Sequence, residues 1–520
     1  MDADAIIVGS GFGGAVTACR LAERGRRVIV LERGRRWDKN NYPREPGDAW
    51  WWSHEAPETH NGWLELRAFR SVAVAQGAAV GGGSLIYANV SAVPPKSVFD
   101  SGWPPEITWV ELEPYYEMVG NFMNVQTVPD GQWARRTHLM KDAADKIGEL
   151  DRFRKVELAV SFDPTWNYEL PDARNPKHSI PFENPHGVEQ GTCVHLGNCY
   201  VGCNVNAKNT LDRNYLARAE RNRADVRPLH LVRGIERTDG GYRVNYEVLG
   251  GGNRRPGSAT ARRVVVAAGS LNSTELLLRC RDELGTLPQL SAFLGRNWST
   301  NGDFLTPAFY SARRIDPSHG PTITSVIDFL DGVQSNKSFW IQDGGLPDLF
   351  ANAIRAYESA HPRIKPVLEA IRRALDSHGP LENVMPWFAQ GVDASNGRFR
   401  LRRRWWWFGR RDLALDWKIQ SSLGLFEAII AMHKRLSDAT GGHPVILPSW
   451  SVANYLVTPH PLGGCGMGTG PENGVVDHKG EVFGYPDLFV IDGASIPRPV
   501  GINPSRTIAA VAERAAALMT

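Results

Sequence analysis

Residues 4–34 read "DAIIVGSGFGGAVTACRLAERGRRVIVLERG", and this stretch decides the fold. The apolar run 4–8 predicts a strand buried on both faces, residues 15–25 have helical spacing, and residues 27–34 predict a second strand. A glycine-rich turn joins the first strand to the helix. The stretch therefore predicts a βαβ unit and an α/β fold class.

The turn carries Gly9, Gly11 and Gly14 at the spacing of a dinucleotide-binding fingerprint. These glycines provide a tight turn, close approach of the backbone to a pyrophosphate, and close helix–strand packing, and the helix N-terminus offers N–H donors. Glu32 ends the second strand 23 residues after Gly9, where an acid hydrogen-bonds ribose hydroxyls. An acid favours FAD or NAD over NADP, and it disfavours the alternative of a tight turn in an ordinary α/β protein.

The choice between FAD and NAD rests on the rest of the chain. A flavoprotein that takes hydride from a nicotinamide has a second glycine fingerprint behind another strand, and no later segment offers one. Two other glycine-bearing segments could serve the one dinucleotide, residues 76–90 and residues 262–279. The second is predicted to be a strand that runs into Gly269 and a helix opened by Asn272.

Composition indicates a globular protein. The 520 residues correspond to roughly three domain equivalents, with 42% hydrophobic and 22% charged residues. The 59 Lys and Arg against 56 Asp and Glu give a net charge of +3, which excludes a whole-molecule field for nucleic acid. Six cysteines are too sparse for a disulfide framework, and the start of the sequence resembles no signal peptide, so we expect a cytoplasmic protein.

A single histidine stands in "NYLVTPHPLGGCGMGTG", residues 454–470. Pro459 and Pro461 restrict the backbone on either side of His460, and the glycines that follow allow close approach of another group. The pattern indicates a histidine that is held in position. The alternative is a loop histidine that bonds to the backbone.

Six motifs occur in order along the chain: "GSGFGG" with Glu32, "VGGGSLIYANV", "CNVNAKNTLDRNYL", "VVVAAGSLNSTELL", "HPLGGCGMG" and "DLFVIDGASIPRPVGINPSRTIAAVAERAA". Together they resemble the glucose-methanol-choline (GMC) oxidoreductases, and most of all the actinobacterial cholesterol oxidase branch, which binds FAD non-covalently. The resemblance implies a discontinuous, Rossmann-like FAD-binding domain made of residues 1–38, 76–92, 207–303 and 460–520. It also implies a substrate-binding domain made of residues 39–75, 93–206 and 304–459, with a six-stranded antiparallel sheet over the flavin.

The resemblance also implies the FAD contacts. The ADP half would be held by Gly9, Gly11, Gly14 and Glu32, with Val232 near adenine; the flavin would pass Gly81, Gly83 and Ser84; Gly269, Asp492, Gly493 and Asn503 complete the set. The segment around Gly83 holds no histidine, so a covalent bond to the flavin is not expected.

In this family a histidine and an asparagine face the substrate hydroxyl, and they correspond to His460 and Asn503 here. The implied reaction is oxidation of a secondary hydroxyl on a bulky, apolar, sterol-like alcohol, with hydride to flavin N5 and the proton to His460. The alternative enzyme is an FAD-dependent dehydrogenase of another hydrophobic alcohol that uses a quinone or protein acceptor. A flavin-free binding protein is the alternative from another class.

The sequence departs from the resemblance at one position. Cholesterol oxidases of this branch use a glutamate to isomerise the steroid double bond, but residues 339–353 hold only Asp343 and Asp348 as acids. Simple alcohol oxidation is therefore expected.

Three further segments invite other interpretations. Cys193, Cys199 and Cys203 lie near His195, but their spacing matches no common zinc or ferredoxin pattern, so inert thiols and no metal are expected. Residues 48–63 are rich in tryptophan and predict either a lid on an apolar cavity or a packed loop.

Residues 398–417 predict a long hairpin in the substrate sheet, with a tip that holds arginines and Trp405, Trp406 and Trp407. The hypothesis is transient contact of residues 402–411 with a membrane surface, against a plain exposed hairpin. The expected partner is a small hydrophobic alcohol, with no nucleic acid, and a monomer is favoured.

Overall fold

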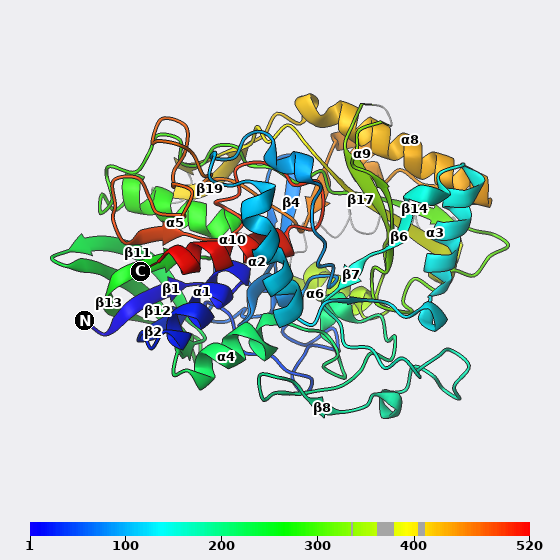
Figure 1. The fold of residues 1–520 in the computed structure, drawn as a ribbon, viewed down its shortest axis with the longest axis horizontal. Helices are drawn as coiled ribbons and strands as arrows, with labels where there is room; N and C mark the ends of the chain where they lie inside the picture. The colour runs from blue at the N-terminus through cyan, green and yellow to red at the C-terminus, as the bar shows by residue number, and fades with distance from the viewer. Residues whose placement is uncertain (334–335, 361–378, 404–410, 520) are drawn as a thin grey trace.

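The computed structural model describes residues 1–333, 336–360, 379–403 and 411–519. Two sheets dominate the molecule, and Figure 1 shows them side by side, with the N-terminal strands in one and β14 and β17 in the other. The predicted α/β class with two kinds of sheet is confirmed. The predicted domain boundaries stay a prediction.

The first sheet is seven-stranded and carries the βαβ unit. Its path is β10-β2-β1-β13-β12-β11, and β22 pairs with β13. The strands are β1 (Ala3–Val8), β2 (Val28–Leu31), β10 (Asp225–Arg227), β11 (His230–Thr238), β12 (Gly241–Gly250), β13 (Asn253–Val266) and β22 (Leu488–Val490). β1 pairs in parallel with β2 and β13, which places the carboxyl ends of these strands at one edge.

Helices complete this half of the molecule. They are α1 (Phe12–Glu23), α2 (Trp109–Phe122), α4 (Tyr215–Arg221), α5 (Ser270–Asp282) and α10 (Ser505–Leu518). α1 packs against α10 and α4 because its alanine and valine side chains are buried almost all round. α5 begins at Ser270, two residues before the predicted start at Asn272, with Gly269 as its N-cap.

The second sheet is six-stranded, and every neighbouring pair in it is antiparallel. Its strands, in spatial order, are β20 (His443–Pro444), β14 (Phe304–Phe309), β17 (Val384–Gly391), β16 (Phe339–Asp343), β15 (Ser325–Phe329) and β6 (Phe153–Lys155). Helices α3 (Arg135–Lys146) and α8 (Leu423–Thr440) pack against this sheet (Figure 1). The predicted six-stranded antiparallel sheet is therefore confirmed.

The remaining elements described here are small. They are β3 (Leu64–Ala68), β4 (Val72–Gly77) and β21 (Leu456–Thr458) in one sheet, the pairs β5 (Gln126–Thr127) with β7 (Glu157–Leu158) and β8 (Phe182–Glu183) with β9 (Glu189–Gln190), the helices α6 (Phe350–Ala360) and α9 (Pro448–Ala453), and the short 3-10 helix η1 (Gly82–Leu85).

The predicted hairpin forms, but not in the substrate sheet. β18 (Arg398–Arg403) and β19 (Arg411–Asp416) pair only with each other among the described strands. The hairpin packs beside α5. It is also held by the segment that follows α5, because Phe399 is buried against Trp298 and its N–H donates to Gly295 O at 2.7 Å. The tip with Trp405 to Trp407 lies outside the described residues.

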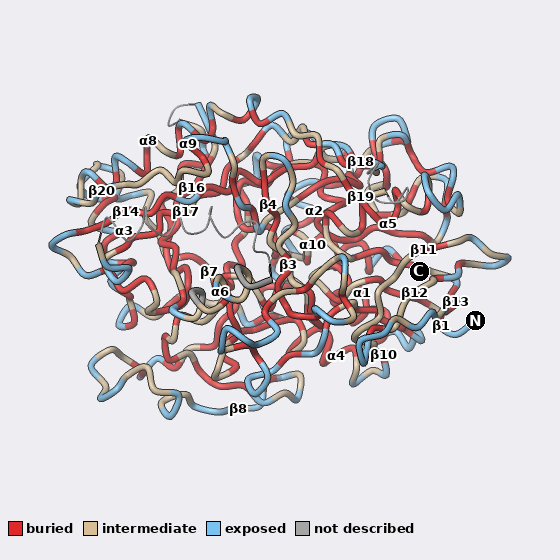
Figure 2. Tube along the Cα trace, turned by 180° about the vertical axis from the view of Figure 1, so that it is seen from behind, coloured by how far each residue is buried: buried red, intermediate tan, exposed pale blue. Residues whose placement is uncertain are grey.

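Burial follows the two sheets. Figure 2 shows buried backbone running through both sheets, with exposed residues concentrated in the outer loops. Within the described ranges, no helix combines the length and the apolar character needed to cross a bilayer.

Candidate active site

A cavity of about 560 Å³ runs from the glycine turn of β1–α1 to His460. It receives residues from both sheets, such as Val8 and Leu231 from the first and Leu305 and Phe388 from the second. The sequence-predicted residues that line it are Gly9, Gly11, Glu32, Gly83, Val232, Gly269, His460, Asp492, Gly493 and Asn503. Gly14, Gly81 and Ser84 are not among its lining residues.

The glycine turn forms one end of the cavity. Gly11 lines it, and a Cβ added at Gly11 would meet no protein atom within 4 Å. The turn thus leaves open a space beside the first N–H groups of α1, where an anionic group binds favourably. Gly14 instead allows the helix to pack closely on the strand, because a Cβ there would lie 2.1 Å from Gly9 O.

Glu32 lies directly after β2 and is held by the same turn. One carboxylate oxygen accepts from Ser10 N at 3.0 Å and Ser10 Oγ at 2.6 Å, and the other accepts from Gly34 N at 2.9 Å. The carboxylate is oriented at the cavity wall, where remaining lone pairs can accept from a ligand hydroxyl.

Asp492 ties two cavity segments together. Its Oδ2 accepts from Gly269 N at 2.7 Å and Ser273 Oγ at 2.5 Å, and its Oδ1 accepts from Ala494 N at 2.7 Å. Burial raises the pKa of the Asp492 carboxyl, and these three hydrogen bonds oppose the rise. The carboxylate therefore fixes the N-terminus of α5 against the segment after β22.

In the segment around η1, Gly83 faces the cavity while Gly81 and Ser84 stabilise the turn. Gly83 lines the cavity, and a Cβ added there would meet no protein atom within 4 Å. Gly81 has φ +98°, and its carbonyl accepts from Ser84 Oγ at 2.7 Å. Ser84 also accepts from Leu211 N at 3.0 Å, so its hydroxyl stabilises the backbone of this turn.

His460 lies at the other end of the cavity and bonds to a carboxylate that the sequence analysis missed. His460 Nδ1 donates to Asp303 Oδ1 at 2.8 Å, and the His460 backbone N–H approaches Asp303 Oδ2 at 3.2 Å. The Asp303 side chain is fully buried, while that of His460 keeps 14% exposure. The pair has the geometry of a base whose tautomer and orientation are set by an acid.

Asn503 completes the site. Its Nδ2 approaches His460 Nε2 at 3.2 Å, and its Oδ1 accepts from Gln342 Nε2 at 2.6 Å. The structure therefore brings His460 and Asn503 together, as predicted, from positions 43 residues apart.

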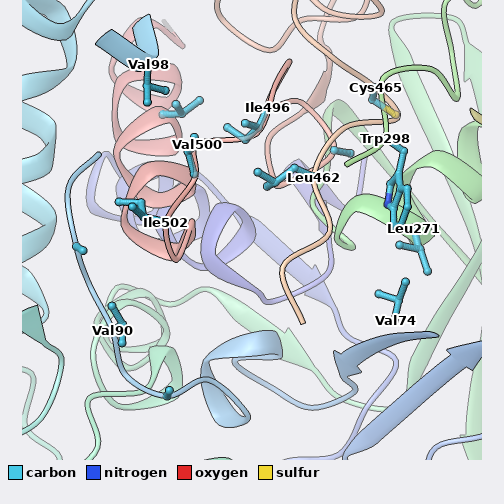
Figure 3. Packing of buried hydrophobic residues seen from close by; sticks show 14 of the residues in the cluster. Val74, Val90, Val98, Leu271, Trp298, Leu462, Cys465, Ile496, Val500 and Ile502 are labelled. Carbon is cyan, nitrogen blue, oxygen red and sulfur yellow. The ribbon is translucent and has the colours of Figure 1, made fainter. Parts of the chain in front are cut away.

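Asn301 holds the loop that carries Asn503. Asn301 Nδ2 donates to Ile502 O at 2.6 Å, and its Oδ1 accepts from the N–H groups of Val500 and Gly501. Val500 and Ile502 belong to this loop, and Figure 3 shows them in the packed hydrophobic cluster with Ile496. The turn 299–303 thus supports both members of the pair, through Asn301 and Asp303.

The two acids in residues 339–353 lie away from this centre. Asp343 is fully buried and paired with Arg136, and its Oδ1 accepts from the N–H groups of Thr324 and Ser325. Asp348 is exposed. The side chain of this stretch that bonds to Asn503 is Gln342, an amide that cannot exchange a proton as an acid does.

The cavity wall that the second sheet and its neighbouring segments contribute is mainly apolar, and the Phe388 ring lies 6.2 Å from the His460 ring. The side chains of this wall include Leu305, Ile323, Leu346, Pro386, Phe388, Leu447, Trp450, Tyr455 and Leu456. This lining suits a large hydrophobic ligand held beside a small polar centre.

The tryptophan-rich segment 48–63 was predicted to be either a lid on the cavity or a packed loop, and it has features of both. Trp50 and Trp63 are buried in a cluster with Trp37 and Tyr42, as in a packed loop. Trp52 lines the cavity and stacks on Arg33, whose guanidinium carbon lies 4.1 Å from the ring centre. Trp52 therefore lies next to Arg33, the neighbour of Glu32 in the sequence.

In the cysteine turn, Cys193, Cys199 and Cys203 are half-buried free thiols and His195 is fully buried. His195 stacks on Trp166 and bonds to Tyr168 and Gln132, and burial lowers its pKa to about 3. Within the described part of the chain, no three His, Cys, Asp or Glu side chains group as metal ligands would.

Sequence reasoning missed Asp303, Gln342 and Ser10. Asp303 lies 157 residues from His460, so no local pattern links the two. Gln342 had a signal, because it is a polar residue in the otherwise apolar strand "FWIQ".

Comparison with known proteins places the chain in a family. The sequence model of the GMC oxidoreductases matches residues 442–512, and that of an NAD(P)-binding Rossmann-like domain matches residues 7–37. The chain is 31% identical to a cholesterol oxidase of Acinetobacter baumannii, with 99% of this chain and 94% of that protein covered. It is 32% identical to a cholesterol oxidase of Mycobacterium tuberculosis, with 99% and 91% covered.

A solved structure supports the fold. The pyridoxine 4-oxidase from Mesorbium loti superposes with a TM-score of 0.65 at 17% identity, over 99% of each chain. At this identity the similarity concerns the fold alone.

Proposed function

Because the chain belongs to the GMC oxidoreductase family of FAD-dependent alcohol oxidoreductases, we propose that it oxidises a secondary hydroxyl on a bulky, sterol-like alcohol to the ketone. The observation that carries the proposal is the Asp303–His460–Asn503 arrangement at the apolar end of the cavity.

The residues present fit FAD. Gly11, Gly83 and Gly269 line the cavity, and at each of them the space that a Cβ would occupy is free of protein atoms. A dinucleotide needs such close backbone approach, and Glu32 lies where ribose hydroxyls are bound. We propose non-covalent binding because residues 76–92 contain no histidine; acid precipitation that leaves the flavin on the protein would contradict this.

FAD supplies the hydride acceptor when bound. The protein's own residues handle the proton. His460 Nε2 faces Asn503 at the cavity wall, and it takes the hydroxyl proton while Asn503 orients the hydroxyl. Asp303 stabilises the imidazolium that results, because its carboxylate accepts from Nδ1 in a charge-assisted hydrogen bond.

The sterol-like substrate class rests on the apolar lining and on the two relatives named cholesterol oxidase. Isomerisation of a steroid double bond is not part of the proposal. It needs a group that carries a proton between two carbons, and Gln342 contributes only an amide in this region.

The test is the visible spectrum of the purified, flavin-loaded protein under anaerobic conditions, before and after addition of a 3β-hydroxysteroid. We expect the flavin band to bleach and to recover in air, and His460→Gln to bleach at least about 100-fold more slowly. A protein that stays oxidised with the steroid would end the sterol assignment.

The same experiment covers the alternative enzyme. Bleaching that does not recover in air, but does recover with a quinone, would favour a dehydrogenase with another acceptor. Bleaching by another hydrophobic alcohol and not by the steroid would change the substrate class.

Membrane contact through residues 402–411 remains a separate proposal. Arg402 and Arg403 are exposed at the end of β18, while the tip itself lies outside the described residues. We also propose a monomeric cytoplasmic protein that meets the membrane transiently. Replacing Trp405 to Trp407 with serine should reduce sedimentation with anionic vesicles, and unchanged sedimentation would end the idea.

A further inference from the structure

A line of buried hydrogen bonds begins in the second sheet and ends at the catalytic pair. We propose that Trp340, Gln390 and Gln342 are positioning residues that set the amide orientation of Asn503 and thereby hold His460 with its proton on Nδ1. The inference rests on the proposed role of His460 as the base.

The hydrogen bonds form one continuous chain. Trp340 Nε1 donates to Gln390 Oε1, Gln390 Nε2 donates to Gln342 Oε1 at 3.2 Å, and Gln342 Nε2 donates to Asn503 Oδ1 at 2.6 Å. Asn503 Nδ2 then reaches His460 Nε2 at 3.2 Å. His460 Nδ1 reaches Asp303 Oδ1 at 2.8 Å and ends the chain.

The two ends of this chain of hydrogen bonds fix the direction in which every bond in it donates. An indole N–H can only donate, and an ionised carboxylate can only accept. Trp340 therefore requires the oxygen of Gln390, which leaves the Gln390 amide nitrogen for Gln342. The same logic passes through Gln342 to Asn503, whose nitrogen then faces His460 Nε2.

His460 Nε2 must then be the acceptor, and the ring proton must lie on Nδ1. Asp303 demands the same tautomer from the other side. An unprotonated Nε2 is the form that can take a hydroxyl proton, so the chain holds the base ready for its task.

Burial of these side chains fixes the direction of the hydrogen bonds. Trp340, Gln342, Gln390 and the Asp303 side chain are fully buried, and Asn503 is 5% exposed. A flipped amide would set donor against donor and acceptor against acceptor with no solvent to compensate, which is costly in a buried network.

The period of two in a strand explains why these residues meet. Trp340 and Gln342 lie on one face of β16, opposite Gln390 and Phe388 of β17. Phe388 lines the cavity, so this face looks toward the catalytic pair. Asp343 and Trp387 lie on the other face, where Trp387 Nε1 donates to Ser437 of α8 at 2.9 Å.

The test measures the tautomer without any substrate. In flavin-loaded protein with 15N-labelled histidine, the signals of His460 are assigned by their loss in His460→Gln. We expect wild-type His460 to show protonated Nδ1 and unprotonated Nε2. A wild-type signature of protonated Nε2 overturns the inference.

Two variants interrupt the chain. Gln342→Met has similar length but no hydrogen bonds, so Asn503 is free to turn its oxygen toward Nε2. We expect the fraction of His460 with protonated Nε2 to rise at least fivefold and anaerobic bleaching by the steroid to slow at least tenfold, with little change in steroid affinity. Trp340→Phe removes only the donor that sets the direction, and we expect a smaller change of the same sign.

Trp387→Phe is the matched control, because it also removes a buried indole donor of the same sheet but lies outside the chain. We expect it to lower the unfolding temperature about as much as Trp340→Phe does and to leave the His460 signals unchanged.

The inference is overturned if Gln342→Met and Trp340→Phe both keep the wild-type His460 signals. If Gln342→Met does not fold, Trp340→Phe against Trp387→Phe decides. A wild-type protein with the expected tautomer that oxidises no alcohol would leave this inference standing and end the proposed function alone.

Discussion

At the residue scale, His460 shows how local and distant constraints combine. Pro459 and Pro461 restrict the backbone beside it, and this was visible in the sequence. The ring itself is oriented by Asp303 and Asn503, which come from other parts of the chain. Backbone restriction alone would leave the ring free to rotate.

Asp303→Asn tests the carboxylate. The amide keeps the shape and can still accept from His460 Nδ1, but it cannot stabilise the positive charge that appears on the ring after proton transfer. We expect the rate of anaerobic bleaching to fall by about 10- to 100-fold, which corresponds to a loss of about 1.4–2.7 kcal/mol of transition-state stabilisation. Stopped-flow absorbance with the steroid measures it.

Thermal unfolding of the same variant provides the control. Asp303 Oδ2 also accepts from Thr458 Oγ1 at 2.6 Å, so a general loosening of this region would lower the unfolding temperature. Bleaching at the wild-type rate would show that the Asp303 charge does not contribute to the reaction.

At the element scale, two glycines of the β1–α1 turn have different structural roles. A Cβ at Gly11 would meet no protein atom, whereas a Cβ at Gly14 would lie 2.1 Å from Gly9 O. Gly11 therefore keeps space for a ligand, and Gly14 allows the helix to approach the strand.

Gly11→Ala and Gly14→Ala form a matched pair of variants. We expect Gly11→Ala to fold with an unfolding temperature of the apoprotein near that of wild type, but to hold flavin at least about tenfold more weakly, because the methyl group enters the cavity. We expect Gly14→Ala to destabilise the apoprotein itself, because backbone atoms must move.

Flavin absorbance per protein and thermal unfolding of the apoprotein measure the two effects. Equal loss of flavin and of stability in both variants would contradict the assignment of different roles to the two glycines.

At the scale of the whole molecule, two buried histidines that do not line the cavity make the fold sensitive to acid. Burial lowers the pKa of His195 and of His433 from 6.5 to about 3. His433 Nδ1 bonds to Thr306 Oγ1 at 2.9 Å, and His195 bonds to Tyr168 and Gln132. Both are neutral in the fold at ordinary pH.

Acid should therefore weaken the fold. Below pH 6.5 the unfolded chain binds a proton at each histidine and the folded protein does not, so the free energy of unfolding falls as pH falls from 6.5 toward 3. Each histidine contributes a slope of at most about 1.4 kcal/mol per pH unit. Denaturant unfolding at several pH values measures it.

His433→Leu should remove the contribution of His433 to the pH dependence of the free energy of unfolding. The stability of wild type relative to the variant should fall steadily as pH falls from 6.5 toward 4, because leucine binds no proton in either state. A constant difference across this range would mean that His433 does not titrate as its burial indicates.

Much of the fold could be predicted from local pattern. The βαβ unit, the buried first strand and the helix after Gly269 follow from apolar periodicity and glycine spacing, which act between neighbours in the chain. The hairpin was found by its alternation, but its partner was wrong, because alternation shows that a strand has a buried face and not which surface covers it.

The sequence by itself determined a dinucleotide cradle and a stiffly held His460 beside Asn503, because glycine and proline act on their own backbone and the family motifs are contiguous. Only the tertiary structure decided that Asp303 orients the histidine and that Gln342, Gln390 and Trp340 reach it through Asn503. These contacts join residues 43 to 161 positions apart, and hydrogen-bond direction depends on which donor meets which acceptor once both sheets have closed over the cavity.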